Sequence, residues 1–145
     1  VVIAGHKGAV ERACEAAKAK GAKRALPLPV SAPFHSSLLK PASDRLRDYL
    51  ASVEFSAPQI QLINNVDVAI VEDPSAIRDA LVRQAASPVR WVESVQKMAS
   101  LGITQLIECG PGKVLTGLAK RIDGTLTADA IVDQASMDTL LEAIK

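Results

Sequence analysis

The stretch that decides the fold runs Ile103-Thr104-Gln105-Leu106-Ile107-Glu108-Cys109-Gly110-Pro111-Gly112-Lys113. Its apolar centre, Leu106 and Ile107, is typical of a buried β-strand. The glycines and the proline after Cys109 predict a turn, and a helix is expected from Lys113 to Ile122. A strand that turns directly into a helix is the repeating unit of parallel α/β sheets.

The same alternation of strand and helix continues on both sides of this stretch. Apolar residues at helical spacing predict further helices over 7–20, 38–53, 73–86, 87–100 and from about 136. Short β-type runs predict strands over 1–4, 25–30, 61–63 and 125–127. Pro27 and Pro29 interrupt the run at 25–30, so its second half is expected to be an edge strand or an extended exit. Pro41 is expected in the first turn of its helix, and either Asp73 or Ser75 caps the next one. The predicted fold class is therefore α/β with a parallel sheet.

Composition excludes several classes of protein. The chain has 145 residues, 48% of them apolar and 23% charged, which are ordinary values for a globular domain. A formal net charge of +1 and 3% aromatic residues do not suit a nucleic-acid-binding protein. No apolar run is long enough for a transmembrane helix, and no signal-peptide pattern is present. Cys14 and Cys109 lack metal-ligand spacing, so we expect two buried free thiols and a cytoplasmic location.

The chain begins Val1-Val2-Ile3-Ala4-Gly5, as though inside a β-strand. Natural termini usually lie in polar segments, so we expect further sequence before Val1. The change of character at Val30-Ser31 is the only candidate domain boundary.

The turn Gly110-Pro111-Gly112-Lys113 invites comparison with a phosphate-binding loop. Val114 stands where the Walker A motif needs Ser or Thr, and Leu115 stands where the Rossmann fingerprint needs its third glycine. A nucleotide-binding domain therefore remains a minor alternative. The other interpretation is a tight turn in which the glycines permit close packing.

His35 is the strongest candidate for chemistry among the residues themselves. It lies in a loop between a predicted strand and a predicted helix, where sites of α/β proteins form. A general base needs a nucleophile within hydrogen-bond reach, and no G-x-S-x-G elbow occurs in the chain. His35 is thus either structural or half of a catalytic dyad.

A basic cluster follows the first predicted helix. Its cations either suit the helix dipole or dock an acidic partner. The cluster consists of Lys18, Lys20, Lys23 and Arg24.

Several motifs in order and spacing resemble malonyl-CoA:acyl-carrier-protein transacylases. The resemblance covers nearly the whole chain and fades after about Thr127. The matching stretches are Gly21-Ala22-Lys23-Arg24-Ala25-Leu26-Pro27-Leu28-Pro29-Val30-Ser31, Pro33-Phe34-His35-Ser36, Asn64-Asn65-Val66-Asp67, Leu81-Val82-Arg83-Gln84, Pro88-Val89-Arg90-Trp91 and Glu108-Cys109-Gly110-Pro111-Gly112-Lys113-Val114-Leu115-Thr116-Gly117-Leu118.

The resemblance implies a ping-pong transfer of malonyl from coenzyme A to the phosphopantetheine thiol of acyl carrier protein in fatty-acid synthesis. It implies that His35 is the general base and acid, oriented by the backbone carbonyl of Gln84. Phe34 occupies a position that senses the α-substituent of the acyl group. Lys23 and Arg24 match a stretch that docks the carrier protein. No cofactor is implied beyond the coenzyme A thioester, which is a substrate.

The resemblance also implies that this is the C-terminal half of the enzyme. The nucleophilic serine, the oxyanion-hole amides and the arginine that binds the malonyl carboxylate would all lie upstream. Residues 1–30 would then complete a small ferredoxin-like subdomain, and residues 31–145 would end a hydrolase-like core. The partners are malonyl-CoA, acyl carrier protein and the N-terminal part of the enzyme. The alternative is a non-catalytic fragment that binds the carrier protein.

Overall fold

A computed structural model describes residues 1–143. The chain divides into two compact units, one spanning Val1–Val89 and one beginning at Arg90. The 1–30 and 31–145 division implied by the family resemblance stays a prediction. No helix within the described residues is long and apolar enough to cross a membrane.

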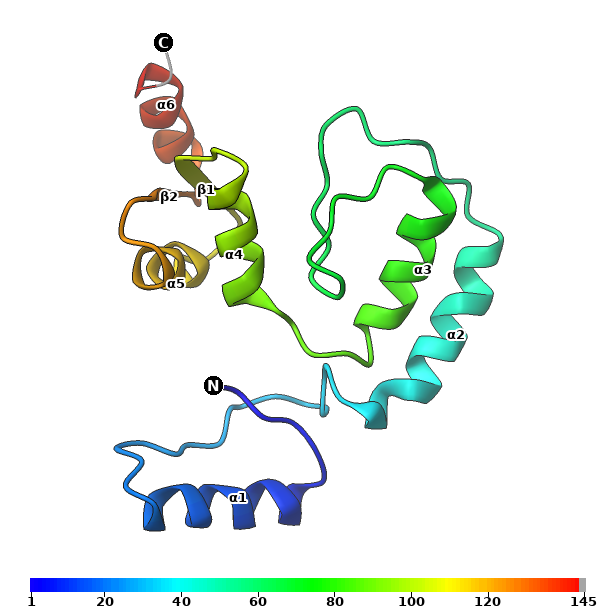
Figure 1. Cartoon of the computed structure of the whole chain (residues 1–145), viewed down its shortest axis with the longest axis vertical. Coiled ribbons are helices and arrows are strands. Elements are labelled where there is room, and N and C mark those ends of the chain that lie inside the picture. The colour runs from blue at the N-terminus through cyan, green and yellow to red at the C-terminus, as the bar shows by residue number, and fades with distance from the viewer. Residues whose placement is uncertain (144–145) are drawn as a thin grey trace. The chain divides into compact units, whose positions relative to one another are not determined.

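The second unit is built on the predicted strand-turn-helix stretch. Strand β1 (Gln105–Cys109) pairs in parallel with β2 (Thr127–Ile131), with Gln105 opposite Thr127 and Cys109 opposite Ile131. Helix α5 (Val114–Ile122) connects the two strands and contacts both (Figure 1). The predicted parallel sheet is confirmed, with two strands in the described part of the chain.

Strand β2 begins later than predicted. Asp123 accepts hydrogen bonds from the amide (2.9 Å) and hydroxyl (2.6 Å) of Thr125, which hold a turn there. Residues of this type favour such local bonds over a strand. The turn therefore moves the start of the strand from Thr125 to Thr127.

Two further helices complete this unit. Helix α4 (Trp91–Ser100) packs on α5, and helix α6 (Gln134–Ala143) packs on β2. The core of the second unit is small and aliphatic, and Val95 in this core is 0% exposed. The other buried apolar residues of this unit are Ala119, Leu126 and Ala128.

The first unit contains α1 (Lys7–Ala19), a 3-10 turn at Ser37–Leu39, α2 (Lys40–Ala51) and α3 (Pro74–Gln84). The predicted helices are confirmed here, including Pro41 in the first turn of α2. Asp73 is the cap of α3 and accepts a hydrogen bond from the Ala76 amide at 2.8 Å. Helices α2 and α3 lie side by side (Figure 1). The buried apolar residues between and around them are Leu50, Ile77, Ala80 and Val82.

Three predicted strands are wrong. Residues 1–4 and 25–30 have no strand structure, and 61–63 contributes only a single antiparallel bridge between Ile63 and Ile70. A β-type run becomes a strand only where a neighbouring backbone offers hydrogen bonds in register. Within the described residues, segments 1–4 and 25–30 have no such neighbour, and several of their apolar side chains, including Ile3 and Leu28, are exposed. Segment 61–63 has one in 70–71, where the Val71 amide donates to the Leu62 carbonyl at 3.1 Å, but the pairing ends after a single bridge.

Candidate active site around His35

His35 lies in a turn between Phe34 and the 3-10 helix that leads into α2. Its backbone has φ 58°, the left-handed region that histidine enters more readily than most residues. The Ser36 hydroxyl donates to the Pro33 carbonyl at 2.7 Å and closes the turn. The local sequence thereby projects the imidazole away from its own chain segment.

The imidazole contacts the C-terminal end of α3. Nδ1 of His35 lies 3.1 Å from the backbone oxygen of Gln84, which is the last residue of that helix. The final carbonyls of a helix have no intrahelical donor and carry its partial negative charge. A carbonyl oxygen can only accept, so this contact requires the proton on Nδ1 and leaves the lone pair on Nε2.

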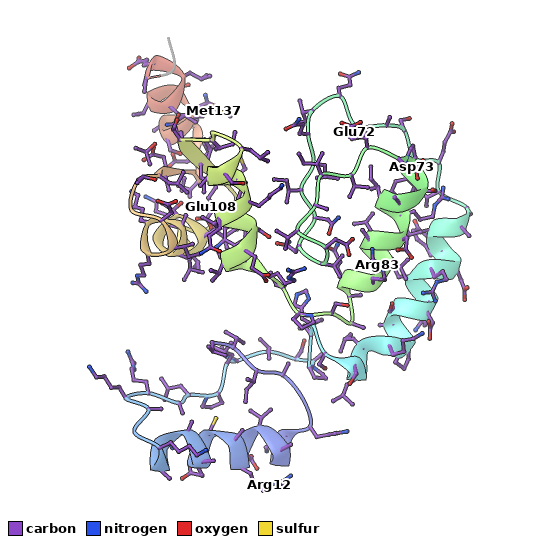
Figure 2. All side chains as sticks on the ribbon, viewed as in Figure 1. Arg12, Glu72, Asp73, Arg83, Glu108 and Met137 are labelled. Atoms are coloured by element: carbon purple, nitrogen blue, oxygen red, sulfur yellow. The ribbon has the colours of Figure 1, made fainter. Side chains whose placement is uncertain are left out.

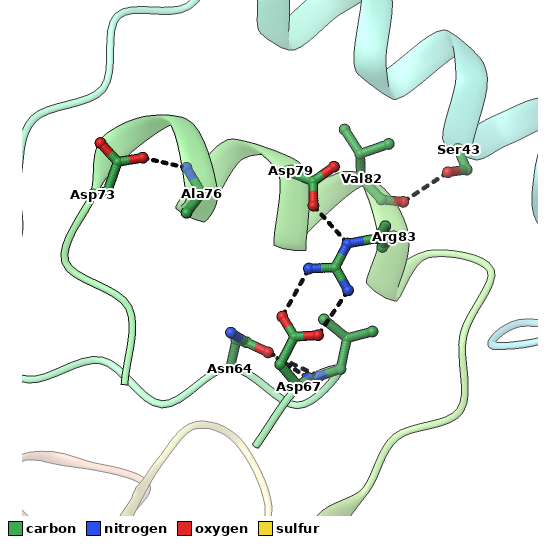
Figure 3. Close-up of polar contacts among 9 residues, drawn as sticks. Ser43, Asn64, Asp67, Asp73, Ala76, Asp79, Val82 and Arg83 are labelled. Atoms are coloured by element: carbon green, nitrogen blue, oxygen red, sulfur yellow. Dashed lines mark hydrogen bonds and ion pairs between the residues drawn. The ribbon is translucent and has the colours of Figure 1, made fainter. Parts of the chain in front are cut away.

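The same end of α3 is held by two other contacts (Figure 3). The hydroxyl of Ser43 donates to the Val82 carbonyl at 2.7 Å in a buried setting. The Arg83 guanidinium donates to both carboxylate oxygens of Asp67, at 2.8 and 2.7 Å, and its Nε donates to Asp79 at 2.6 Å. These carboxylates raise the pKa of Arg83 above its ordinary value, Asp67 more than Asp79.

Sequence reasoning missed Ser43, Arg83 and Asp67. The spacing of Asp79 and Arg83, four residues apart, is a local signal for an ion pair on a helix. Asp67 is 16 residues from Arg83, and Ser43 is 39 residues from Val82. No local sequence pattern predicts contacts between residues so far apart in the chain.

The chemistry available here is that of an oriented base. His35 is exposed, so its free Nε2 is accessible. The neighbouring Ser36 hydroxyl is directed at the Pro33 carbonyl, so its proton is not offered to the imidazole. The arrangement can therefore accept a proton from a nucleophile that approaches from elsewhere.

The remaining predicted site residues are exposed. Phe34 directly precedes His35 and is 50% exposed, whereas Lys23 and Arg24 lie in the segment after α1. The structure therefore brings His35 and Gln84 together. The roles of Phe34, Lys23 and Arg24 stay predictions.

The turn between β1 and α5 does not offer a phosphate site. Glu108 lies in the second unit (labelled in Figure 2), and its carboxylate accepts hydrogen bonds from the amide and the hydroxyl of Thr116, both at 2.8 Å, in the first turn of α5. Both bonds lower the pKa of Glu108, and the bond from the Thr116 amide has the larger effect. An anion already occupies the end of the helix where a phosphate would bind, which disfavours the nucleotide-binding alternative.

Among residues 1–143, the glycines of this turn do not serve close packing. A Cβ added at Gly110 or Gly112 would meet no other atom of that part of the chain within 4 Å. The expectation that these glycines permit close approach is therefore wrong for this structure.

The described residues also form no candidate metal site. Among residues 1–143 no group of three His, Cys, Asp or Glu side chains is placed to hold a metal ion. Both cysteines are free thiols, but the expectation that they are buried is wrong, because Cys109 is exposed and Cys14 is half-buried.

Comparison with known proteins gives a consistent picture. No family model matches the chain. The malonyl CoA-acyl carrier protein transacylase of Salmonella typhimurium is 59% identical over 141 residues, which are 97% of this chain and 46% of the relative. That of Bacillus subtilis is 40% identical over 145 residues, or 100% of this chain and 46% of the relative. The chain thus spans about half the length of the curated relatives it matches.

Solved structures that resemble this chain are of enzymes with the same or equivalent names. An acyl-carrier-protein S-malonyltransferase from Burkholderia pseudomallei is 67% identical with a TM-score of 0.91, over 95% of this chain and 45% of that one. A malonyl-transacylase in complex with a type II polyketide synthase acyl carrier protein is 56% identical with a TM-score of 0.93, over 96% of this chain and 45% of that one. By sequence and by fold, the chain is similar to about half the length of malonyl CoA-acyl carrier protein transacylases.

Proposed function

We propose that this chain is part of an enzyme that transfers malonyl from coenzyme A to the phosphopantetheine thiol of acyl carrier protein in fatty-acid synthesis. The observation that carries the proposal is the contact of His35 Nδ1 with the Gln84 carbonyl at 3.1 Å. It presents Nε2 as a base in a chain whose relatives are named transacylases.

In the first half-reaction a serine outside this chain attacks the thioester carbonyl of malonyl-CoA. Nε2 of His35 takes the serine proton as the new ester bond forms, and then gives it to the departing coenzyme A sulfur. In the second half-reaction Nε2 takes the proton of the carrier thiol, which attacks the ester, and returns it to the serine oxygen. The Gln84 carbonyl holds the Nδ1 proton throughout and stabilises the imidazolium that forms.

Three other residues take part through binding. Phe34 would crowd the methyl group of a methylmalonyl substrate, which favours malonyl. Lys23 and Arg24 would attract an acidic surface of the carrier protein; a neighbouring solved structure is a transacylase bound to such a protein. The proposal includes a cytoplasmic location and a C-terminal position in the whole enzyme. In that enzyme residues 1–30 would belong to a ferredoxin-like subdomain and residues 31–145 to a hydrolase-like core.

The test is a joined enzyme, in which this chain replaces the matching segment of the Salmonella typhimurium transacylase. We expect it to transfer malonyl to carrier protein, with the malonyl adduct found on a serine of the Salmonella part by mass spectrometry. His35→Ala should lower kcat by about 10²–10⁴-fold. The unmodified Salmonella enzyme is the positive control.

Two outcomes would contradict the proposal. An adduct on Ser36 or Ser37 of the isolated chain would place the nucleophile within it. A folded joined enzyme that transfers no malonyl, together with an isolated chain that binds carrier protein, would favour the non-catalytic fragment.

A further inference from the structure

Three consecutive residues at the end of α3 contact three different parts of the first unit. Val82 accepts from Ser43 on α2, Arg83 binds Asp67 in the loop before α3, and Gln84 accepts from His35. Arg83 lies between Val82 and Gln84 in sequence, and its side chain links this end of α3 to the loop that carries Asp67 (Figure 3).

The backbone bonds at this helix end are weak by comparison. The Ala86 amide reaches the Arg83 carbonyl at 3.2 Å, and the Ser87 amide reaches the Gln84 carbonyl at 3.3 Å. Helix ends fray in general, because their last carbonyls lack intrahelical donors. The bidentate pair of Arg83 with Asp67, at 2.8 and 2.7 Å, is shorter and has a fixed fork geometry.

The loop that carries Asp67 is itself well held. The Asn64 side-chain oxygen accepts from the amides of Val66 (3.1 Å) and Asp67 (2.7 Å), and the Val68 amide donates to the Asn64 carbonyl at 3.1 Å. Val68 has φ 58°, a costly conformation for a β-branched residue that persists only where the surroundings hold it. Asp67 is therefore an anchor in an ordered turn, although its side chain is 37% exposed.

We propose that Arg83 and Asp67 form a positioning clamp that holds the Gln84 carbonyl against Nδ1 of His35. The proposal rests on the proposed function only for its effect on catalysis. Its structural consequence is that the clamp keeps the neutral imidazole in the Nδ1–H tautomer. Arg83 acts on the site through the Gln84 carbonyl, so it is a positioning residue and not a catalytic one.

The chain supplies a closely matched control. Asp79 binds the same guanidinium as Asp67, but from within α3, four residues earlier. Removing Asp67 disconnects the helix end from its loop, whereas removing Asp79 leaves that connection in place. Asp67→Ala and Asp79→Ala should therefore differ, although both remove a carboxylate from Arg83.

The experiment uses the joined enzyme and measures the ¹⁵N chemical shifts of the His35 imidazole, assigned by their loss in His35→Ala. We expect the Nδ1–H tautomer in the unmodified joined enzyme and in Asp79→Ala. In Asp67→Ala and Arg83→Met the Nε2–H tautomer should grow. In both variants kcat should fall about tenfold, because a small displacement of a reacting group is costly, while the KM for malonyl-CoA stays unchanged. Asp67→Glu, which keeps the charge, should recover part of the loss.

Thermal unfolding identifies any variant that has lost its fold, and Asp67→Ala keeps the test available if Arg83→Met does not fold. The clamp is refuted if Asp67→Ala retains the original tautomer and kcat, or if Asp79→Ala changes both equally. A joined enzyme that shows the tautomer shift but transfers no malonyl would refute the proposed function and not the clamp.

Discussion

The hydrogen bond from Ser43 to the Val82 carbonyl offers a measurable link between packing and the candidate site. Ser43 is 3% exposed and Val82 is 2% exposed, so water does not reach the bond. Ser43→Ala removes the donor and leaves the Val82 carbonyl without it in a buried setting. The side-chain volume changes little, so the cost is mainly that of an unsatisfied carbonyl, about 2 kcal/mol.

The assay is urea unfolding of the joined enzyme, followed by circular dichroism. With a slope of about 2–3 kcal/mol per molar urea, a loss of about 2 kcal/mol lowers the unfolding midpoint by roughly 0.7–1 M. Ser52→Ala is the matched control, because the Ser52 hydroxyl also donates to a backbone carbonyl, that of Tyr49 at 2.9 Å, but in an exposed setting.

Loss of that exposed bond should change stability by less than about 0.5 kcal/mol, since water replaces the donor. Equal losses in the two variants would refute the reasoning that burial sets the cost. A Ser43→Ala variant as stable as the unmodified joined enzyme would do the same.

Three further predictions concern substrate choice, partner docking and pH. Phe34→Ser should raise the ratio of methylmalonyl to malonyl kcat/KM in the joined enzyme, because relief of one crowded methyl contributes about 1–3 kcal/mol; an unchanged ratio contradicts this. Lys23→Glu with Arg24→Glu should raise the KM for carrier protein and weaken its salt dependence, with malonyl-CoA hydrolysis as the control that must stay the same. The bonds from Thr116 lower the pKa of Glu108 below its ordinary value of 4.5, so they stabilise the fold above that pH and the benefit disappears as pH falls through the lowered value. In Glu108→Gln, the free energy of unfolding measured by urea titration should therefore fall less steeply as the pH is lowered below 4.5. If the fall is as steep as in the unmodified joined enzyme, other groups cause the acid unfolding.

The helices show how much a local pattern can predict. Apolar residues at helical spacing, Pro41 in a first turn and Asp73 as a cap are all features of a few adjacent residues, and the structure confirms them. Helix formation depends on hydrogen bonds between neighbours in sequence, so the information lies within the segment.

The strands show where local patterns stop. The run from Leu106 to Ile107 became part of β1 because β2 lies beside it, whereas the β-type run at 25–30 has no strand structure. The run at 25–30 contains Pro27 and Pro29, which cannot donate to a β-ladder, and among the described residues no strand lies beside it. Strand formation depends on a partner elsewhere in the chain, and residue type alone does not supply one.

The sequence by itself determined the helices, the strand-turn-helix unit at 103–122 and the family motifs that single out His35 and Gln84. Tertiary structure alone decided that these two residues, 49 apart, meet at 3.1 Å, and that Arg83 and Asp67 join beside them. The physical reason is the range of the interactions. Caps and helical periodicity act over a few residues, whereas the contact at Gln84 exists only once α2 and α3 pack and bring distant backbone together.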